Sequence, residues 1–168
     1  MYGKTQLTLA VIFAVLIIAW GGTRLYLEKV EFNVECGDVL KRAADANTIQ
    51  LAKKELKAAL DYMEREELTS GYTSIMYNSP SEDVGFWYTN VKTSYEELLS
   101  LPNDVAPLER SNMLMKLRET LLDNTDSGTT VTVPKGISVF PHNTLFACWG
   151  WGSFLLCGIF LWRWYKEN

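Results

Sequence analysis

The residues most often used for chemistry are few in this 168-residue chain. His142 is the single histidine, so a metal or haem site that needs two histidines is excluded within one copy of the chain. The three cysteines, Cys36, Cys148 and Cys157, contain no CxxC pair and are odd in number, which is not the pattern of a disulfide framework. We therefore expect no metal and no cofactor.

The acidic residues also lack a catalytic arrangement. Glu66 with Glu67 and Glu96 with Glu97 are chain neighbours, and neighbouring side chains on a helix diverge. Catalysis instead needs groups that converge and have tuned pKa values. The chain has no Walker loop, dinucleotide fingerprint, nucleophile elbow or zinc-ligand spacing. We expect that the protein is not an enzyme.

One enzymatic alternative is a membrane enzyme that uses Cys36 as its nucleophile. This chemistry needs a lowered thiol pKa. The nearby carboxylates Glu31, Glu35 and Asp38 would instead raise the thiol pKa, because a negative charge disfavours the thiolate. The residue types around Cys36 therefore argue against this alternative.

The densest aromatic group consists of Phe86, Trp87 and Tyr88. Such a group is typical of a packed core, but aromatic residues are also enriched in interface hot spots. A third possibility is a ligand pocket between helices with Trp87 as one wall. The sequence leaves all three interpretations open.

The charge of the central region excludes one class of partner. Residues 24–143 hold 13 Lys or Arg and 19 Asp or Glu, a net charge of −6. Nucleic-acid binding proteins present a basic face to the phosphate backbone. We therefore expect no nucleic-acid partner.

Two apolar runs flank this charged region. The first is LTLAVIFAVLIIAW, residues 7–20, and the second is LFACWGWGSFLLCGIFLWRW, residues 145–164. Twenty helical residues at about 1.5 Å each span roughly 30 Å, the thickness of a bilayer's hydrocarbon core. The sequence predicts transmembrane helices at 7–23 and 144–165, with membrane lipids as their surroundings.

The orientation follows from the first run, which resembles an export signal because Lys4 precedes an apolar centre. We interpret it as a retained signal anchor. Residues 1–6 and 166–168 are then cytoplasmic and residues 24–143 are extracytoplasmic. The expected location is a bacterial inner membrane or an equivalent organelle membrane, such as the thylakoid.

Small residues recur at a spacing of four in both runs. In lipid, helices associate through close packing at small side chains, since burying apolar surface gives no advantage over the lipid tails. These residues therefore predict docking surfaces for another membrane protein or for a second copy of the chain. The pairs are Ala10 with Ala14, Cys148 with Gly152, and Ser153 with Cys157.

The central region reads as a small antiparallel helical bundle, so the predicted fold is all-α. Apolar periodicity predicts helices over about 38–68, 80–101 and 105–123. Ser79, Pro80 and Glu82 form a helix-start signature for the second helix. Prolines and β-branched residues in 131–143 predict an extended strap with one or two short strands.

The apolar rows of these three helices give a candidate core. The first contains Ile49, Leu56 and Met63, with Ala52, Ala59 and Leu60 at offset positions; the second contains Val84, Trp87, Val91 and Leu98; the third contains Leu108, Met115 and Leu122, beside Leu114, Leu117 and Leu121.

These features lead to one leading hypothesis and one alternative. The leading hypothesis is a non-enzymatic two-span membrane protein, a structural or accessory subunit whose helical domain and small-residue faces mediate protein assembly. The alternative is an extracytoplasmic ligand or stress sensor. A helical domain between two spans resembles the sensor half of chemoreceptors in layout, without a shared motif, and such a sensor would signal through a separate protein.

Overall fold

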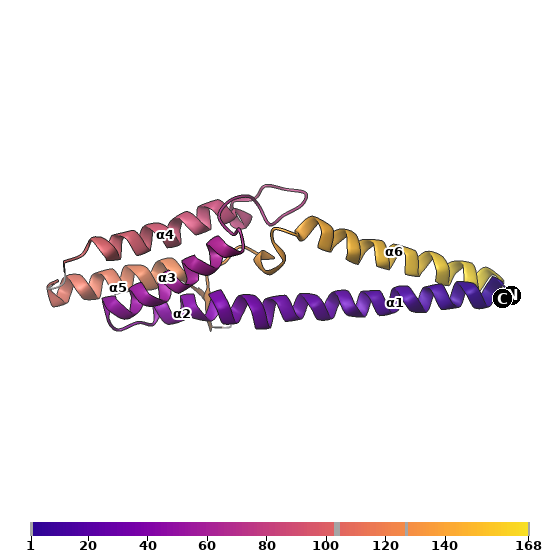
Figure 1. Cartoon of the computed structure of the whole chain (residues 1–168), viewed down its shortest axis with the longest axis horizontal. Coiled ribbons are helices and arrows are strands. Elements are labelled where there is room, and N and C mark those ends of the chain that lie inside the picture. The colour runs from indigo at the N-terminus through magenta and orange to yellow at the C-terminus, as the bar shows by residue number, and fades with distance from the viewer. Residues whose placement is uncertain (1, 103–104, 127, 168) are drawn as a thin grey trace.

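A pair of long helices forms one end of the molecule and a group of packed helices forms the other (Figure 1). The computed structural model describes residues 2–102, 105–126 and 128–167. The chain is mostly helical, with one small antiparallel sheet. Both described ends lie together at the outer end of the helix pair (Figure 1).

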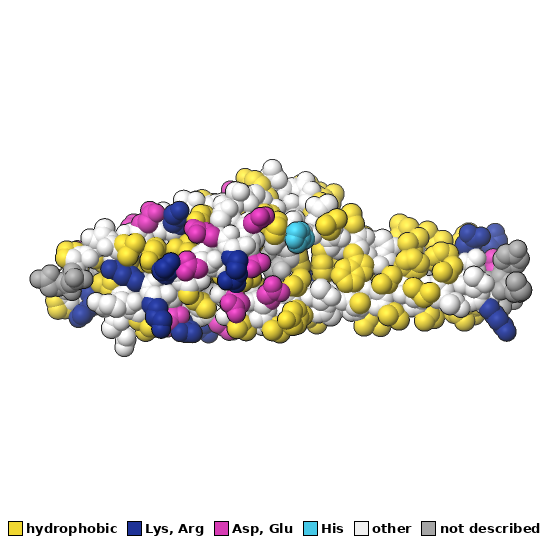
Figure 2. Space-filling model, in the orientation of Figure 1, with side chains coloured by type: hydrophobic (Ala, Val, Ile, Leu, Met, Phe, Trp, Pro, Cys, Tyr) yellow, Lys and Arg dark blue, Asp and Glu magenta, His cyan; other side chains and the backbone are white. Residues whose placement is uncertain are grey.

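The helix pair consists of α1 (Tyr2–Tyr26) and α6 (Asn143–Glu167), which pack against each other. Both are long and apolar enough to cross a membrane. Only 11% of the most apolar part of each helix is buried, whereas a core helix of a water-soluble protein is mostly buried. Figure 2 shows the consequence: hydrophobic side chains cover the helix pair, and charged ones gather on the other half and at the far end.

The first helix does not end at the predicted membrane boundary. It continues through a π-helical segment, η1 (Leu27–Gly37), into α2 (Asp38–Ala44). A new helix was expected to start at about residue 38, but Gly37 and Asp38 both have right-handed helical dihedrals and lie within this continuous rod. The predicted separation between membrane helix and domain helix at this point is therefore wrong.

The predicted helix over 38–68 is two helices, because the chain reverses after Ala44. The second, α3, spans Ile49–Arg65. Thr48 caps it by accepting a hydrogen bond from the Leu51 amide at 3.2 Å, which is the role that threonine plays at helix starts. Across the turn, Arg42 donates to the buried Glu55 carboxylate at 2.6 Å and joins α2 to α3.

The next two helices are α4 (Val84–Ser100) and α5 (Pro107–Leu121). The predicted start at Ser79 is wrong by one turn: Pro80–Glu82 form a short 3-10 helix, η2, and Asp83 caps α4 by accepting from the Phe86 amide at 2.9 Å. Helices α2, α3, α4 and α5 pack around one apolar core. We call this part, together with the strands below, the helical domain.

The strands lie earlier than predicted. β1 (Leu122–Thr125) and β2 (Gly128–Val131) form an antiparallel hairpin in which Leu122 pairs with Val131. The hairpin occupies a segment that sequence composition assigns to the end of a helix and a loop. After it, the strap runs through a 3-10 turn, η3 (Ile137–Val139), to α6, and Ile137 is buried in the domain core.

Candidate functional site

The small residues of the two apolar helices divide into an inner and an outer set. Ala10 is only 2% exposed, and the Cys157 thiol donates to its backbone oxygen at 3.6 Å. Ser153 is also buried, and Ala14 is half-buried. Ala10, Ser153 and Cys157 thus lie where α1 and α6 meet, so this contact is within the chain.

Cys148 and Gly152 form the outer set. Cys148 is exposed, and a Cβ added at Gly152 would meet no other atom within 4 Å. Neither residue takes part in the packing of α6 on α1. The face of α6 that carries Cys148 and Gly152 therefore points away from α1.

A tryptophan and a glycine that the sequence interpretation did not single out join the helices near the helical domain. The Trp20 indole donates to the Phe146 backbone oxygen at 2.9 Å, and the two rings lie 5.5 Å apart. A Cβ on Gly150 would lie 2.6 Å from the Trp20 ring, so only glycine leaves room for the indole. Gly150 occurs in a glycine-rich run, but nothing local in the sequence identifies Trp20 as its partner.

The aromatic group Phe86, Trp87 and Tyr88 divides between core and surface. Trp87 is 7% exposed, and its indole donates to the Thr132 backbone oxygen at 2.9 Å. Phe86 is 65% exposed, and the Tyr88 hydroxyl donates to Glu64 at 2.7 Å on the surface. Trp87 is therefore a core residue that ties the strap to α4, while Phe86 remains available for contacts.

A cavity of 330 Å³ lies beside Trp87. Its lining combines residues of α4 with Thr132 and Lys135 of the strap. The Thr132 hydroxyl is buried and has no hydrogen-bond partner among the described residues. The cavity is within the size range of small-molecule sites and is lined by both apolar and polar side chains.

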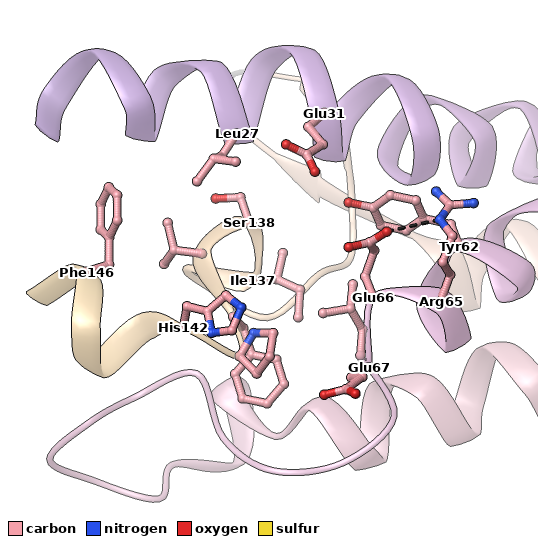
Figure 3. A pocket seen from close by; sticks show the side chains of 14 residues that line it. Leu27, Glu31, Tyr62, Arg65, Glu66, Glu67, Ile137, Ser138, His142 and Phe146 are labelled. Atoms are coloured by element: carbon pink, nitrogen blue, oxygen red, sulfur yellow. Dashed lines mark hydrogen bonds and ion pairs between the residues drawn. The ribbon is translucent and has the colours of Figure 1, made fainter. Parts of the chain in front are cut away.

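A second groove, of 380 Å³, lies between η1, the end of α3 and the strap (Figure 3). Glu31, Glu66 and His142 line it, and Tyr62 lies at its inner end. Burial, the main cause, and the surrounding acidic groups raise the pKa of Tyr62 to about 12. No group of three His, Cys, Asp or Glu side chains positioned to hold a metal ion occurs in the described ranges.

Cys36 is fully buried in the core of the helical domain. Burial raises the pKa of its thiol from the ordinary value of 9.0 to about 12. The thiol is therefore protonated near neutral pH and is out of reach of a substrate. Both properties argue against Cys36 as a nucleophile.

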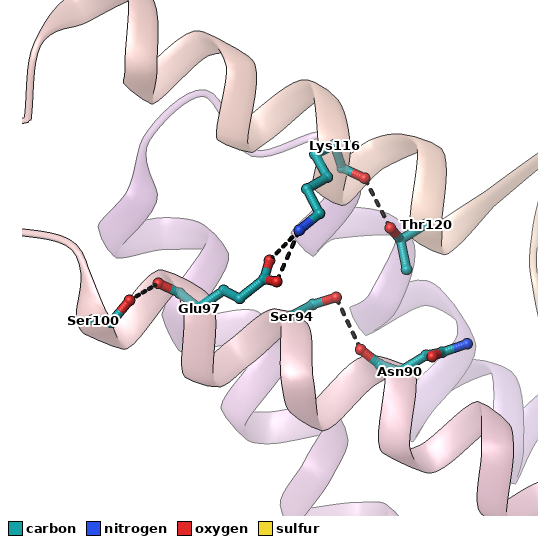
Figure 4. Close-up of polar contacts among 6 residues, drawn as sticks. All are labelled: Asn90, Ser94, Glu97, Ser100, Lys116 and Thr120. Carbon is teal, nitrogen blue, oxygen red and sulfur yellow. Dashed lines mark hydrogen bonds and ion pairs between the residues drawn. The ribbon is translucent and has the colours of Figure 1, made fainter.

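Several polar side chains of α4 and α5 are paired with one another or with the backbone (Figure 4). Lys116 forms an ion pair with Glu97 at 2.6 Å across the two helices, and both side chains are partly solvated. Ser94 and Thr120 each donate to a backbone oxygen of their own helix, at 2.9 Å. These contacts hold a surface together and bring no reactive groups into convergence.

Comparisons with models of protein families, with curated proteins and with solved structures give no match.

Proposed function

We propose that the chain is an integral membrane protein that crosses its membrane twice and serves as a non-enzymatic structural or accessory subunit. The observation that carries this proposal is the exposure of α1 and α6. These helices bury one face against each other and leave the apolar side chains of the remaining faces uncovered. Such a surface is stable in lipid, where apolar side chains need no cover.

The surface available for assembly is the outer face of α6, around Cys148 and Gly152. Both residues are small; Cys148 is exposed, and no described side chain fills the space around Gly152. A partner helix can approach closely there. The partner is another membrane protein or a second copy of this chain.

The helical domain supplies further exposed apolar side chains for assembly. Phe86 lies at the start of α4, and Leu108 and Met115 lie on α5. Exposed aromatic residues such as Phe86 commonly anchor protein interfaces. In the proposed orientation the domain lies on the extracytoplasmic side of a bacterial inner membrane or an equivalent organelle membrane.

Native mass measurement of the protein, purified in mild detergent, tests the assembly. We expect a species heavier than one chain, and we expect Gly152→Leu to lower its yield because leucine keeps a partner helix away. Gly158→Leu is the matched control, since Gly158 on α6 also has open space around it but lies about 120° around the helix from Gly152. A strictly monomeric wild-type protein without a co-purifying partner would contradict the proposal.

A second candidate function is favoured by the cavity beside Trp87. A ligand bound there would lie between Trp87 of α4 and Lys135 of the strap, as in a sensor domain that binds its ligand between elements. Ligand binding raises the melting temperature by mass action, so a thermal-shift screen of the whole chain in detergent tests this function. Trp87→Phe should abolish any shift that arises at this cavity, whereas Trp20→Phe should not, because Trp20 lies between α1 and α6 and does not line the cavity.

A further inference from the structure

A third groove, of 480 Å³, lies where α1, α6 and the loop between α3 and α4 meet. We call it the juxtamembrane groove, because it begins where the apolar run of α1 ends. Its apolar wall comes from both long helices and consists of Trp20, Phe146, Trp151 and Phe154. Trp151 is 77% exposed, so this wall is continuous with the outer apolar surface of α6. A molecule lying in the surrounding lipid can therefore enter the groove sideways.

One cation stands at the polar end of the groove. Arg24 lines it, and no acidic side chain does. Arg24 forms no ion pair with any described residue. Arg24 also lines a separate neighbouring hollow, together with Glu28 and Lys135. An arginine without a partner beside an apolar wall is complementary to an amphiphile with a negatively charged head.

A buried hydroxyl lines the same groove. Thr73 is 7% exposed, and its Oγ1 has no hydrogen-bond partner among the described residues. The Thr73 backbone oxygen accepts from the Asn143 side chain at 2.6 Å, which fixes the loop against the first turn of α6. The apolar wall and the loop beside it are thus held by two hydrogen bonds, from Trp20 to the Phe146 backbone oxygen and from Asn143 to the Thr73 backbone oxygen.

The loop that carries Thr73 also exposes an apolar tip. Ile75, Met76 and Tyr77 are exposed, Met76 by 79%, and Ile75 lines the groove. The loop extends toward the beginning of α6 in Figure 1. Exposed apolar residues at this level are suited to the boundary between lipid headgroups and acyl chains. The tip would therefore rest on the same lipid leaflet that supplies the occupant of the groove.

We propose that the juxtamembrane groove binds one anionic phospholipid, whose phosphate accepts hydrogen bonds from Arg24 and whose acyl chain lies along Trp20, Phe146 and Trp151. This inference rests on the proposed membrane-spanning function. A lipid fits better than a soluble anion because the apolar wall is the larger part of the groove. It fits better than a protein segment because the wall opens onto the surface that faces the acyl chains.

Native mass spectrometry of the full chain in mild detergent, mixed with phosphatidylglycerol or phosphatidylcholine, tests the site. We expect one tightly held phosphatidylglycerol and weaker retention of the zwitterionic phosphatidylcholine. Arg24→Gln should lower the affinity for phosphatidylglycerol about fivefold, as the loss of about 1 kcal/mol per cation near a membrane surface predicts. Lys29→Gln is the matched control, since Lys29 is an exposed cation five residues later that does not line the groove.

A second pair of variants tests the apolar wall. Trp151→Ser should weaken retention of both lipids, whereas Trp162→Ser should not, although both tryptophans are exposed on α6. Because both side chains are mostly exposed, we expect both variants to fold. Circular dichroism checks that each variant keeps its helix content.

Three results would overturn the lipid site. They are equal retention of phosphatidylglycerol by wild type and Arg24→Gln, displacement of the lipid by millimolar inorganic phosphate, and a co-purifying polypeptide that Arg24→Gln releases. An alkaline wash of membranes separates this failure from failure of the proposed function. If the protein stays in the washed membranes but retains no lipid, only the lipid site is contradicted. If the wash releases the protein, the proposal that it spans the membrane is contradicted as well.

Discussion

Phe86 and Trp87 are adjacent in the chain but have opposite environments. Trp87 lies in the row Val84, Trp87, Val91 and Leu98, which periodicity assigns to the inner face of its helix, and all four side chains are buried. Phe86 lies outside that row and is exposed. The helical spacing therefore distinguishes the buried Trp87 from the exposed Phe86, whereas the fact that both are aromatic does not. The hydrogen bond from Trp87 to Thr132 was not predictable, because it joins residues 45 positions apart.

The contrast between these two residues gives a stability prediction. Trp87→Phe removes the indole donor and leaves the Thr132 backbone oxygen without it. We expect the free energy of unfolding to fall by about 2 kcal/mol, the cost of an unsatisfied buried polar group. Phe86→Ser should change it by less than about 0.5 kcal/mol, as surface substitutions do. Chemical denaturation in mild detergent, followed by circular dichroism, measures both, and equal effects would contradict the burial described here.

Cys36 predicts a loss of stability in alkali. Its folded pKa of about 12 lies above the ordinary 9.0, so the unfolded chain loses the thiol proton first as the pH rises. The contribution of Cys36 to the free energy of unfolding is complete below pH 9 and is lost progressively between pH 9 and 12. The melting temperature should therefore fall above pH 9, and less steeply in Cys36→Ala. If the melting temperature of Cys36→Ala falls as steeply with pH as that of the wild type, burial of this thiol does not cause the loss of stability.

At the level of single elements, apolar rows identified helices better than they identified helix ends. The row Ile49, Leu56 and Met63 is buried, as expected for the inner face of α3. In α5 the row containing Leu117 and Leu121 is buried, but Leu108 and Met115 of the other row are exposed. That helix offered two possible inner faces, and only the position of its neighbours decides between them.

The reversal between α2 and α3 shows why helix ends were missed. Asp45 to Thr48 contain no glycine or proline, so periodicity continued through them to give one helix. The capping bond of Thr48 is local and could have been recognised. The ion pair from Arg42 to the buried Glu55 is formed only once the two helices lie side by side.

Gly150 makes the pairing of α1 with α6 testable. Leucine there would overlap the Trp20 ring, and such overpacking costs about 1–3 kcal/mol. Ala10→Cys, in a background with Cys148→Ser, should form a disulfide with Cys157 on mild oxidation, because the Cys157 thiol lies 3.6 Å from the Ala10 backbone oxygen. Gly150→Leu should lower the yield of this disulfide, read by peptide mass spectrometry, and Gly158→Leu should not. An equal yield in both would contradict the packing.

At the level of the whole molecule, the two apolar runs were enough to predict two long helices able to cross a membrane, and both are present. Their pairing was not predictable, because it depends on contacts such as Trp20 with Phe146, which are 126 residues apart. The continuity of α1 with α2 was also missed, since Gly37 is a common helix-ending residue. Here Gly37 has helical dihedrals, and the Phe32 and Asn33 side chains lie next to it.

The shared position of the two described ends predicts how the chain is labelled across a membrane. In a background without native cysteines, Ser81→Cys on the domain should react with an impermeant maleimide in intact cells. Lys4→Cys and Lys166→Cys should react only after permeabilisation, because both lie at the opposite end of the helix pair. The reverse pattern would keep the two spans and invert the proposed orientation. Labelling of all three positions in intact cells would contradict the spans themselves.

The unbroken helix from Tyr2 to Ala44 mechanically joins the two halves of the protein. At about 1.5 Å per residue it is a rod of roughly 65 Å. A lever of that length turns a tilt of about 5° at one end into a shift of roughly 6 Å at the other. A neighbouring protein that tilts α1 by this amount would thus move the far end of the rod by more than the width of a methyl group. Leu40 and Ala43, which are buried in the core, lie at that end.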